Sequence, residues 1–329
     1  MRRRSFSGIQ PSGIPTIGNY FGALRHWVNM QDEYDGVYCV VDMHALTIRR
    51  SPQELAGNIR YLYALLRAVG IDPDRSTLFV QSHVPAHAQM MWLLSCYTMY
   101  GEMLRMTQFK DKSKKHPDNV NTGLFIYPVL QAADILLYDA HAVPIGADQK
   151  QHVEITRDIA ERVNALYGPV FTLPEPLIPP VGGKILSLLD PTRKMDKSDP
   201  LPGAYISLDD SRAAIAQKLK RAVTDSEGSV RYDPEHKPGV SNLLGIYSLC
   251  EGITTREAEG IFSQGGYGAL KDAVTEALDA TLAPVREKVA CYLADLPQLD
   301  ALMREGAEKA SAYADTVLRK LCAALGLLP

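Results

Sequence analysis

The sequence has 329 residues, of which 46% are hydrophobic and 22% are charged, and its net charge is −3. This length and composition are those of a globular protein with two domains and a sizeable core. No apolar run approaches the roughly 20 residues that cross a bilayer, and the basic start lacks the apolar stretch of a signal peptide. We therefore expect a cytoplasmic protein that has no membrane partner.

The cysteines and charged residues exclude further classes of protein. The five cysteines include no C-x-x-C pair, which argues against a disulfide framework and against a thiolate zinc site. The small net charge is no general signature of nucleic-acid binding, so a polyanion would need a local basic patch. Residues 105–116, "RMTQFKDKSKKH", form one such patch, although a solvated charged loop would have the same composition.

Short apolar runs and helical patterns alternate through the first part of the chain. This alternation predicts an α/β fold, a Rossmann-like doubly wound parallel sheet with right-handed crossovers. From about Ser207 the pattern indicates only helices, so we expect a catalytic domain over 1–205 and an all-helical domain over 206–329. The last helix is a candidate for packing back on the catalytic domain. The expected strands are 5–10, 36–42, 76–82, 141–146 and 184–190, and the expected helices before the boundary are 19–34, 51–70, 86–105, 127–140 and 147–168.

A glycine-rich turn, "PSGIPTIGNYFG" at residues 11–22, connects the first expected strand to the first expected helix. A turn that leads into a helix N-terminus can hold phosphate, because free backbone N–H groups and the helix dipole point at the anion. A tight β-to-α turn without a ligand has the same composition. The turn alone leaves both interpretations open.

A second polar loop, "PTRKMDKSDPLPG", carries two lysines around a methionine and an aspartate. The lysines could close on a polyphosphate and neutralise charge on a leaving pyrophosphate, or the loop could be a solvated basic turn. Two other segments, one with Asp42 and His44 and one with His83 and His87, are weak zinc candidates. They lack thiolates and a matching third ligand, so we expect no tightly bound metal.

Five segments together resemble bacterial tryptophanyl-tRNA synthetases, which are class I aminoacyl-tRNA synthetases. They are "GIQPSGIPTIGNYFGAL", "LRMTQFKDKS", "AADILLYDAHAVPIGADQKQHVE", "KMDKSDP" and "AVTDSEGSVRYDPEHKPGVSNLL", in family order over nearly the whole chain. "TIGN" stands for the HIGH signature of class I, and "KMDKS" stands for the KMSKS signature. The resemblance implies ATP-dependent activation of L-tryptophan to tryptophanyl-adenylate with release of pyrophosphate. Transfer of the amino acid to tRNA(Trp), with release of AMP, would follow.

The resemblance also implies where ATP binds. Because the tryptophan carboxylate attacks the α-phosphate directly, the enzyme needs positioning and positive charge rather than a nucleophile of its own. Mg²⁺ would accompany ATP, held by phosphate oxygens and water. The implied catalytic residues are Thr16, Gly18, Asn19, Lys112, Lys194, Lys197 and Ser198, and ATP would also contact Gln10, Pro11, Ser12, Gly146, Ala147, Asp148, Ile185, Met195 and Asp196.

Tryptophan recognition has a clear requirement, because the indole N–H donates one hydrogen bond and accepts none. A buried carboxylate meets this requirement, and Asp134, between an alanine and an isoleucine in an apolar helix, is the matching position of the family. Within the resemblance, Tyr127 and Gln149 suit the α-ammonium group and the apolar members suit the indole faces. The full set is Asp134, Phe6, His44, Tyr127, Gln131, Val143, Ile145 and Gln149.

Two residues depart from the family pattern. Asp196 replaces the usual serine of KMSKS, where it would either weaken phosphate attraction or order the loop by pairing with Lys194 or Arg193. Gln131 stands where relatives often have methionine. Three alternatives stay open: a tyrosine-specific synthetase, a non-ligating paralogue that senses tryptophan or ATP, and a nucleotidyltransferase for a small cofactor, which would leave the helical domain unexplained.

The resemblance further implies macromolecular partners. The helical domain would bind the anticodon of tRNA(Trp), and residues 218–225, "KLKRAVTD", are a candidate basic edge, although an ordinary amphipathic helix has similar charges. The resemblance also implies a homodimer in which one tRNA spans both subunits. The apolar helix expected at 86–104 is a candidate element of that interface.

Overall fold

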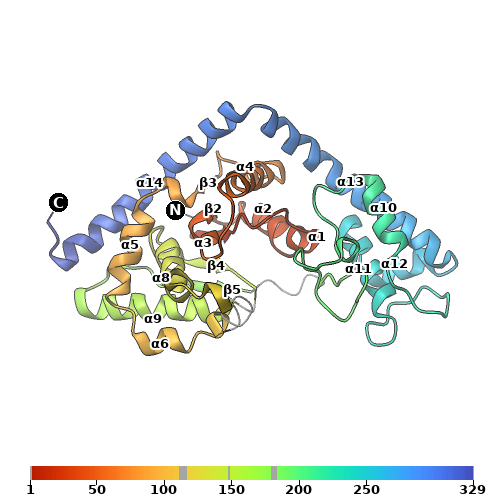
Figure 1. The fold of residues 1–329 in the computed structure, drawn as a ribbon, viewed down its shortest axis with the longest axis horizontal. Coiled ribbons are helices and arrows are strands. Elements are labelled where there is room, and N and C mark those ends of the chain that lie inside the picture. Colours follow the sequence, from red (N-terminus) through yellow and green to blue (C-terminus); the bar gives the residue numbers. More distant parts are fainter. Residues whose placement is uncertain (1, 111–116, 147–148, 179–183, 329) are drawn as a thin grey trace. The chain divides into compact units, whose positions relative to one another are not determined.

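The computed structural model describes residues 2–110, 117–146, 149–178 and 184–328. The chain divides into two compact units, each described by itself (Figure 1). The sheet unit comprises Met1–Ser12, Asn29–Pro180 and Asp295–Pro329, and the helical unit comprises Gly13–Val28 and Val181–Ala294. The glycine-rich turn therefore begins in one unit and ends in the other. The division of catalytic and tRNA-binding roles at residue 205 stays a prediction.

The sheet unit is built on a five-stranded parallel sheet with the strand order β3-β2-β1-β4-β5. Continuous burial along β2 and β3 is typical of strands that are covered on both faces. The Rossmann-like fold class is thereby confirmed. The strand order reverses between β1 and β4, and in such sheets ligands bind beside the carboxyl ends of the strands at the reversal. The strands are β1 (Arg4–Ile9), β2 (Asp35–Val40), β3 (Ser76–Val80), β4 (Ala142–Pro144) and β5 (Glu175–Leu177).

The helices of the sheet unit begin where the sequence supplies a cap. Ser51 Oγ accepts a hydrogen bond from the Glu54 N–H at the start of α4, and Asn121 Oδ1 accepts one from the Leu124 N–H at the start of α8. The helices are α3 (Asp42–Ala45), α4 (Pro52–Ala68), α5 (Ala86–Ser95), α6 (Tyr100–Leu104), α8 (Thr122–Leu136), α9 (Lys150–Tyr167) and α14 (Leu296–Leu325), with 3₁₀ turns at Gln81–His83 and Pro117–Asn119.

The prediction of one helix over residues 86–105 is wrong, because the chain interrupts it between α5 and α6. The Thr98 hydroxyl donates a 2.9 Å hydrogen bond to the Leu94 carbonyl at the end of α5. The same kind of bond occurs inside helices that continue, such as that of Thr156 to the His152 carbonyl in α9, so it does not by itself end α5. The next helix then starts afresh, with the Glu102 carboxylate accepting from the Met99 N–H.

The prediction of a strand over 184–190 is also wrong. The fifth strand is β5, in the proline-rich segment before it, where Pro176 pairs with Val143 of β4. Proline is tolerated there because β5 is an edge strand, whose outer side needs no N–H donor. Leu186 instead forms an isolated antiparallel bridge with Lys194 in the helical unit.

The last helix, α14, packs against the edge strand β3 and against α4 and α5 within the sheet unit. Gly306 permits this approach, because a Cβ atom there would lie 1.9 Å from the Leu78 carbonyl oxygen. The Arg60 guanidinium donates two hydrogen bonds to the Asp300 carboxylate, at 2.9 and 2.8 Å. These contacts attach the end of the chain to the sheet.

The helical unit holds the start of the first helix and most of the second half of the chain. The helix expected over 19–34 begins earlier, at Ile17, and contains a π-helical turn. The long helix α13 packs against α10, α11 and α12. The elements are α1 (Ile17–Asn19), the π-helical turn (Tyr20–Leu24), α2 (Arg25–Met30), a 3₁₀ turn (Pro202–Ala204), α10 (Arg212–Lys220), α11 (Pro238–Glu251), α12 (Thr255–Phe262) and α13 (Gly266–Ala294).

Candidate active site

A buried carboxylate, Asp134, lies at the centre of a polar cluster in the sheet unit. It is on α8 and only 1% exposed. Its Oδ1 accepts hydrogen bonds from Gln81 Nε2 at 2.6 Å and from His87 Nδ1 at 2.7 Å, and its Oδ2 accepts one from His44 Nε2 at 2.7 Å. A buried carboxylate is costly unless it is hydrogen-bonded, so these three donors explain how an apolar helix carries Asp134.

Further hydrogen bonds of Gln81 and His87 show which of their atoms face Asp134. Gln81 Oε1 accepts a hydrogen bond from the Met43 N–H at 3.1 Å, which turns the amide nitrogen of Gln81 toward Asp134. His87 Nε2 lies 2.8 Å from the Tyr138 hydroxyl. His87 Nδ1 donates to Asp134, since a carboxylate can only accept.

The cluster keeps Asp134 ionised while leaving it one acceptor position. Burial alone raises the pKa of Asp134, but His44 and His87 outweigh burial and lower this pKa to about 2. Each carboxylate oxygen can accept about two hydrogen bonds. Oδ1 already has two donors, whereas Oδ2 has one donor among the described residues. A ligand that donates a single hydrogen bond suits the remaining position on Oδ2.

Three of the residues predicted around tryptophan share one face of α8. Tyr127, Gln131 and Asp134 lie four and three residues apart, which places them on the same side of the helix. The ring of His44 faces Tyr127 edge-on with 6.2 Å between the ring centroids. The Tyr127 hydroxyl lies 2.9 Å from His152 Nε2. The structure thus brings three of the predicted residues, His44, Tyr127 and Gln131, together with Asp134.

The other predicted tryptophan-binding residues lie on β1 and around β4. Phe6 is buried in β1, and its ring stacks on Tyr138 with 5.7 Å between centroids. Val143 is buried in β4, and half-buried Ile145 and Gln149 follow that strand. Phe6 therefore reaches the cluster through Tyr138, which in turn contacts His87.

The nucleotide residues predicted in the sheet unit follow the two strands at the reversal of strand order. Gln10, Pro11 and Ser12 come directly after β1, and Gly146 comes two residues after β4. Because β1 and β4 are parallel neighbours, their carboxyl ends lie at the same edge of the sheet. Lys112, Ala147 and Asp148 lie outside the described residues.

The signature turn forms a helix start in the helical unit. Thr16 is buried and caps α1, where its N–H donates to Asn19 Oδ1 at 2.9 Å and its carbonyl accepts from the Asn19 N–H at 2.9 Å. A Cβ atom at Gly18 would lie 3.3 Å from Thr16 Oγ1, a tight approach. An antiparallel bridge between Thr16 and Ser207 ties the turn to the chain that follows the lysine loop.

The lysine loop, residues 193–199, lies against the same turn. Lys197 Nζ donates a 3.3 Å hydrogen bond to the Gly13 carbonyl. Lys194 is exposed, whereas Met195 and Ile185 are buried and joined by a 3.0 Å hydrogen bond from the Met195 N–H to the Ile185 carbonyl. The helical unit thus brings the two signature segments of class I together, although they lie far apart in the sequence.

Asp196 orders the loop in a way that the sequence did not indicate. Its Oδ1 accepts a 2.8 Å hydrogen bond from the backbone N–H of Ser198. Arg193 forms its ion pair with Asp199, at 3.9 Å, and no ion pair of Asp196 with Arg193 or Lys194 occurs among the described residues. The expected ion pair is therefore not the contact of Asp196 that the described residues show, and its effect on phosphate attraction stays a prediction.

Comparison with known proteins decides the family. The family described as "tRNA synthetases class I (W and Y)" matches residues 2–283. The tryptophanyl-tRNA synthetase of Mycoplasma pneumoniae is 35% identical, with a TM-score of 0.88 over 100% of this chain and 99% of that chain. The tryptophanyl-tRNA synthetase of Campylobacter jejuni, in a structure complexed with ADP and tryptophan, is 34% identical, with a TM-score of 0.87 over 98% of this chain and 100% of that chain. The chain belongs to the tryptophanyl-tRNA synthetases.

Membership of the tryptophanyl-tRNA synthetases confirms the predicted enzyme class and reaction, those of an ATP-dependent tryptophan–tRNA ligase. A tyrosyl-tRNA synthetase from Aeropyrum pernix shares the fold, with 20% identity and a TM-score of 0.68. No helix in the described part of the chain combines the length and apolar character needed to cross a bilayer. The roles of individual site residues stay predictions.

The sequence analysis of this synthetase missed several members of the Asp134 cluster. His87 drew attention only as a weak zinc candidate, and it instead donates to Asp134. Gln81, directly after β3, and Tyr138, just after α8, were not singled out. The one available signal was position, because Gln81 follows the carboxyl end of a parallel strand, where binding residues gather.

Proposed function

We propose that this synthetase binds tryptophan at the Asp134 cluster and binds the ATP phosphates at the signature turn and the lysine loop. The single observation that carries the first assignment is the remaining acceptor position on a buried, ionised Asp134 Oδ2. The indole N–H is a single donor, so it matches that position in number and in polarity. A phenyl ring would leave the position unpaired, which costs about 1–3 kcal/mol.

The remaining tryptophan residues divide by chemistry. Tyr127 is buried and Gln149 is half-buried. The Tyr127 hydroxyl and the Gln149 amide oxygen would accept hydrogen bonds from the α-ammonium group. Val143 and Ile145 supply apolar surface near β4 for the indole faces. Gln131, on the same face of α8 as Asp134, would lie at the margin of the indole site.

The activation step needs positioning and charge neutralisation. A tryptophan carboxylate oxygen attacks the α-phosphorus, the new P–O bond forms, and the bond to the bridging oxygen breaks so that pyrophosphate leaves with the electron pair. Lys194 and Lys197 would bring ammonium groups to that pyrophosphate as its charge develops. The signature turn at Gly18 and Asn19 would face a phosphate oxygen, because the glycine permits a close approach of the backbone.

Further nucleotide contacts and the metal complete the ATP assignment. Gln10, Pro11, Ser12 and Gly146 would contact ATP at the strand ends of the sheet unit, with Ile185, Met195, Asp196 and Ser198 contributing from the lysine loop and its base. Mg²⁺ would enter with ATP, since this ion keeps several water ligands and binds phosphate oxygens readily. It would neutralise part of the triphosphate charge.

We infer the second step and the macromolecular partners from the resemblance to the family. The helical unit would contact the anticodon of tRNA(Trp), with residues 218–225 as a candidate basic edge.

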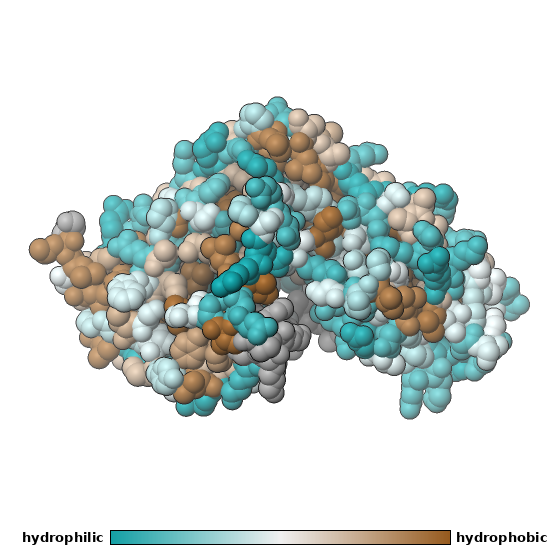
Figure 2. Space-filling view, in the orientation of Figure 1, coloured by the Kyte–Doolittle hydropathy of each residue, from teal (hydrophilic) through white to brown (hydrophobic). Residues whose placement is uncertain are grey.

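A homodimer is supported by exposed aromatic and apolar side chains on α5 and α6, among them Trp92 at 71% and Tyr100 at 70% exposure. Figure 2 shows hydrophobic surface over the part of the sheet unit where these helices lie. Trp92→Glu should shift sedimentation from dimer to monomer, and a monomeric unmodified protein would contradict the interface.

An amino-acid panel tests the proposed function. Purified protein is incubated with ATP, labelled pyrophosphate and one amino acid at a time, and the incorporation of label into ATP is measured. Tryptophan should support exchange, and tyrosine and phenylalanine should not. Exchange with tyrosine and none with tryptophan would refute the assignment. Charging of tRNA(Trp) by the same preparation separates a ligase from a protein that only senses tryptophan.

A further inference from the structure

The base of the lysine loop is a small two-stranded ladder in the helical unit. Ser187 donates its N–H to the Arg193 carbonyl at 2.9 Å, and Met195 donates its N–H to the Ile185 carbonyl at 3.0 Å. Leu186 lies opposite Lys194 between these two bonds. In an antiparallel ladder this is a non-hydrogen-bonded pair, so the N–H and C=O of Leu186 point away from Lys194.

The outward N–H and C=O of Leu186 are both taken by one side chain. Asn242 of α11 accepts from the Leu186 N–H through Oδ1 at 2.8 Å and donates to the Leu186 carbonyl through Nδ2 at 3.0 Å. Asn242 is buried, with 8% exposure. The side-chain amide of Asn242 carries an acceptor oxygen and a donor nitrogen in one plane. It therefore makes the two hydrogen bonds that the backbone of a neighbouring strand would otherwise make.

This contact matters because a two-stranded ladder is marginal by itself. An isolated hairpin has little independent stability in water, and an unpaired edge leaves backbone groups unsatisfied. Asn242 hydrogen-bonds to the outer edge of the ladder at Leu186, the residue that lies directly opposite Lys194. The position of the first lysine of the loop is therefore coupled to the position of α11.

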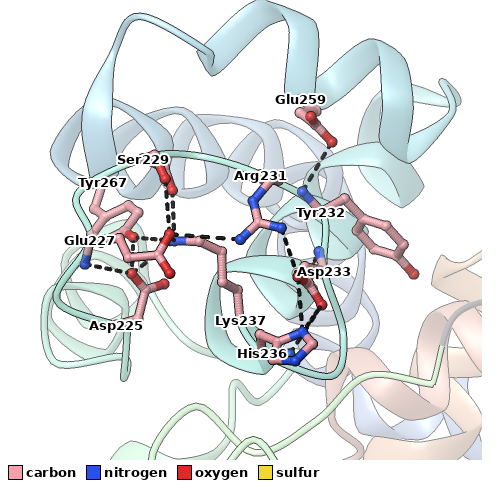
Figure 3. Close-up of polar contacts among 11 residues, drawn as sticks. Asp225, Glu227, Ser229, Arg231, Tyr232, Asp233, His236, Lys237, Glu259 and Tyr267 are labelled. Atoms are coloured by element: carbon pink, nitrogen blue, oxygen red, sulfur yellow. Dashed lines mark hydrogen bonds and ion pairs between the residues drawn. The ribbon is translucent and has the colours of Figure 1, made fainter.

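The start of α11 is itself fixed by a charge network around a buried lysine (Figure 3). The Lys237 side chain, directly before α11, is fully buried. Its Nζ donates to Asp225 Oδ1 at 2.8 Å, to Tyr267 Oη at 3.0 Å and to the Ser229 carbonyl at 3.1 Å, and it forms an ion pair with Glu227 at 3.0 Å. Burial lowers the pKa of Lys237, but its hydrogen bonds to these groups outweigh burial and raise this pKa above its ordinary value. Lys237 therefore stays charged and joins α11 to the chain that follows α10.

The chain that follows α10 also contacts the segment beneath the loop. Val223 donates its N–H to the Leu188 carbonyl at 2.8 Å. Gly239 of α11 packs on Val223, where a Cβ atom would lie only 2.1 Å from the Val223 carbonyl oxygen. The loop base is thus held at Leu186 by Asn242 and at Leu188 by Val223, and Lys237 and Gly239 connect these two supports.

We propose that Asn242 is a positioning residue for the activation reaction, which holds the lysine loop at its base so that Lys194 and Lys197 reach the pyrophosphate. It acts through Leu186 and the ladder, without touching the substrates. The segment "AVTDSEG…KPGVSNLL", used above only to recognise the family, then supports the base of the lysine loop. This inference rests on the proposed phosphate-binding role of the loop.

The test compares Asn242→Ala and Asn242→Asp with the unmodified protein. The first removes both hydrogen bonds, and the second keeps the size but turns an acceptor toward the Leu186 carbonyl. We expect the rate of tryptophan-dependent pyrophosphate exchange to fall about 10-fold to 100-fold, because small misplacements of charged groups have effects of that size. The KM for tryptophan should stay unchanged, because its proposed site is in the sheet unit.

Limited trypsin digestion provides a readout that does not depend on activity. Mass spectrometry identifies cleavage after Lys194 and Lys197, and we expect it to be about 10-fold faster in both variants because the local opening cost falls. The matched control is Asn164→Ala in the sheet unit, which removes a similar clamp on the backbone of Val170 and Phe171. It should leave cleavage in the lysine loop unchanged.

The outcomes separate this inference from the proposed function. If cleavage in the lysine loop is unchanged in both Asn242 variants, the positioning role is refuted, even if the rate of pyrophosphate exchange falls. A parallel rise in KM for tryptophan with no fall in rate would overturn it as well. If the unmodified protein exchanges label with another amino acid instead of tryptophan, the proposed function fails, and the cleavage comparison still decides whether Asn242 orders the loop.

Discussion

Asp134→Asn is the substitution that most directly tests the tryptophan site. The single amide oxygen should take the place of Oδ1, because Gln81 Nε2 and His87 Nδ1 both donate there. The amide nitrogen then replaces Oδ2 and faces His44 Nε2 and the indole N–H. His44 can change tautomer and accept, but the indole N–H can only donate. Leaving this donor unpaired should weaken tryptophan binding by about 1–3 kcal/mol, or about 5-fold to 150-fold.

An analogue measures this contact by itself. In the benzothiophene analogue of tryptophan, sulfur replaces the indole N–H while the ring shape is kept. Equilibrium dialysis with labelled ligands should show that the unmodified protein prefers tryptophan to the analogue by a similar factor. Asn at position 134 should remove this preference, because neither ligand then gains from the N–H. Asp300→Asn on α14 is the control for loss of a carboxylate elsewhere in the sheet unit.

A contact between Asp134 and the indole N–H is refuted if Asp134→Asn weakens both ligands equally while the protein stays folded. Equal losses would mean that Asp134 shapes the pocket through His44 and His87 without contacting the indole. Thermal unfolding of the variant separates this result from general destabilisation. A variant that retains full preference for tryptophan would refute the contact outright.

Three further predictions concern catalysis, acid stability and packing. Lys197→Ala should lower the rate of pyrophosphate exchange about 100-fold and leave tryptophan affinity unchanged, and equal losses in both would contradict the loop's role. The pKa of Asp134 falls to about 2 in the folded protein from about 3.9 when unfolded. The resulting stability, about 2–3 kcal/mol, is therefore present above pH ~5 and is lost as the pH falls toward ~2. Urea unfolding across this range should show the loss, and Asp134→Asn should lack it. Gly306→Ala should lower the free energy of unfolding by about 1–3 kcal/mol, because the new Cβ would lie 1.9 Å from the Leu78 carbonyl oxygen; an unchanged urea midpoint would exclude that clash.

Two errors in the predicted elements have local physical causes. The break between α5 and α6 coincides with a new helix start, where the Glu102 carboxylate accepts from the Met99 N–H, and the apolar periodicity of residues 86–105 does not reveal this contact. Strand β5 was missed because prolines argue against a central strand, whereas Pro176 lies on an edge strand. Whether a strand lies at the edge or at the centre of a sheet is decided only when the sheet is assembled.

The sequence by itself indicated the fold class and the family, and it predicts the chemistry of each signature segment. Alternating strand and helix patterns predict a parallel sheet, and the segments around Thr16, Asp134 and Lys197 occur in the order of the family. These features are local, because periodicity and turn chemistry act over a few residues.

Only the tertiary structure decided which groups meet. Asp134 gains Gln81, His87 and His44 from three other segments, and these partners set both its charge and its remaining acceptor position. Asn242 likewise meets Leu186 from 56 residues away. Hydrogen bonds between distant segments depend on how the helices and strands pack, and no local pattern in the sequence carries that information.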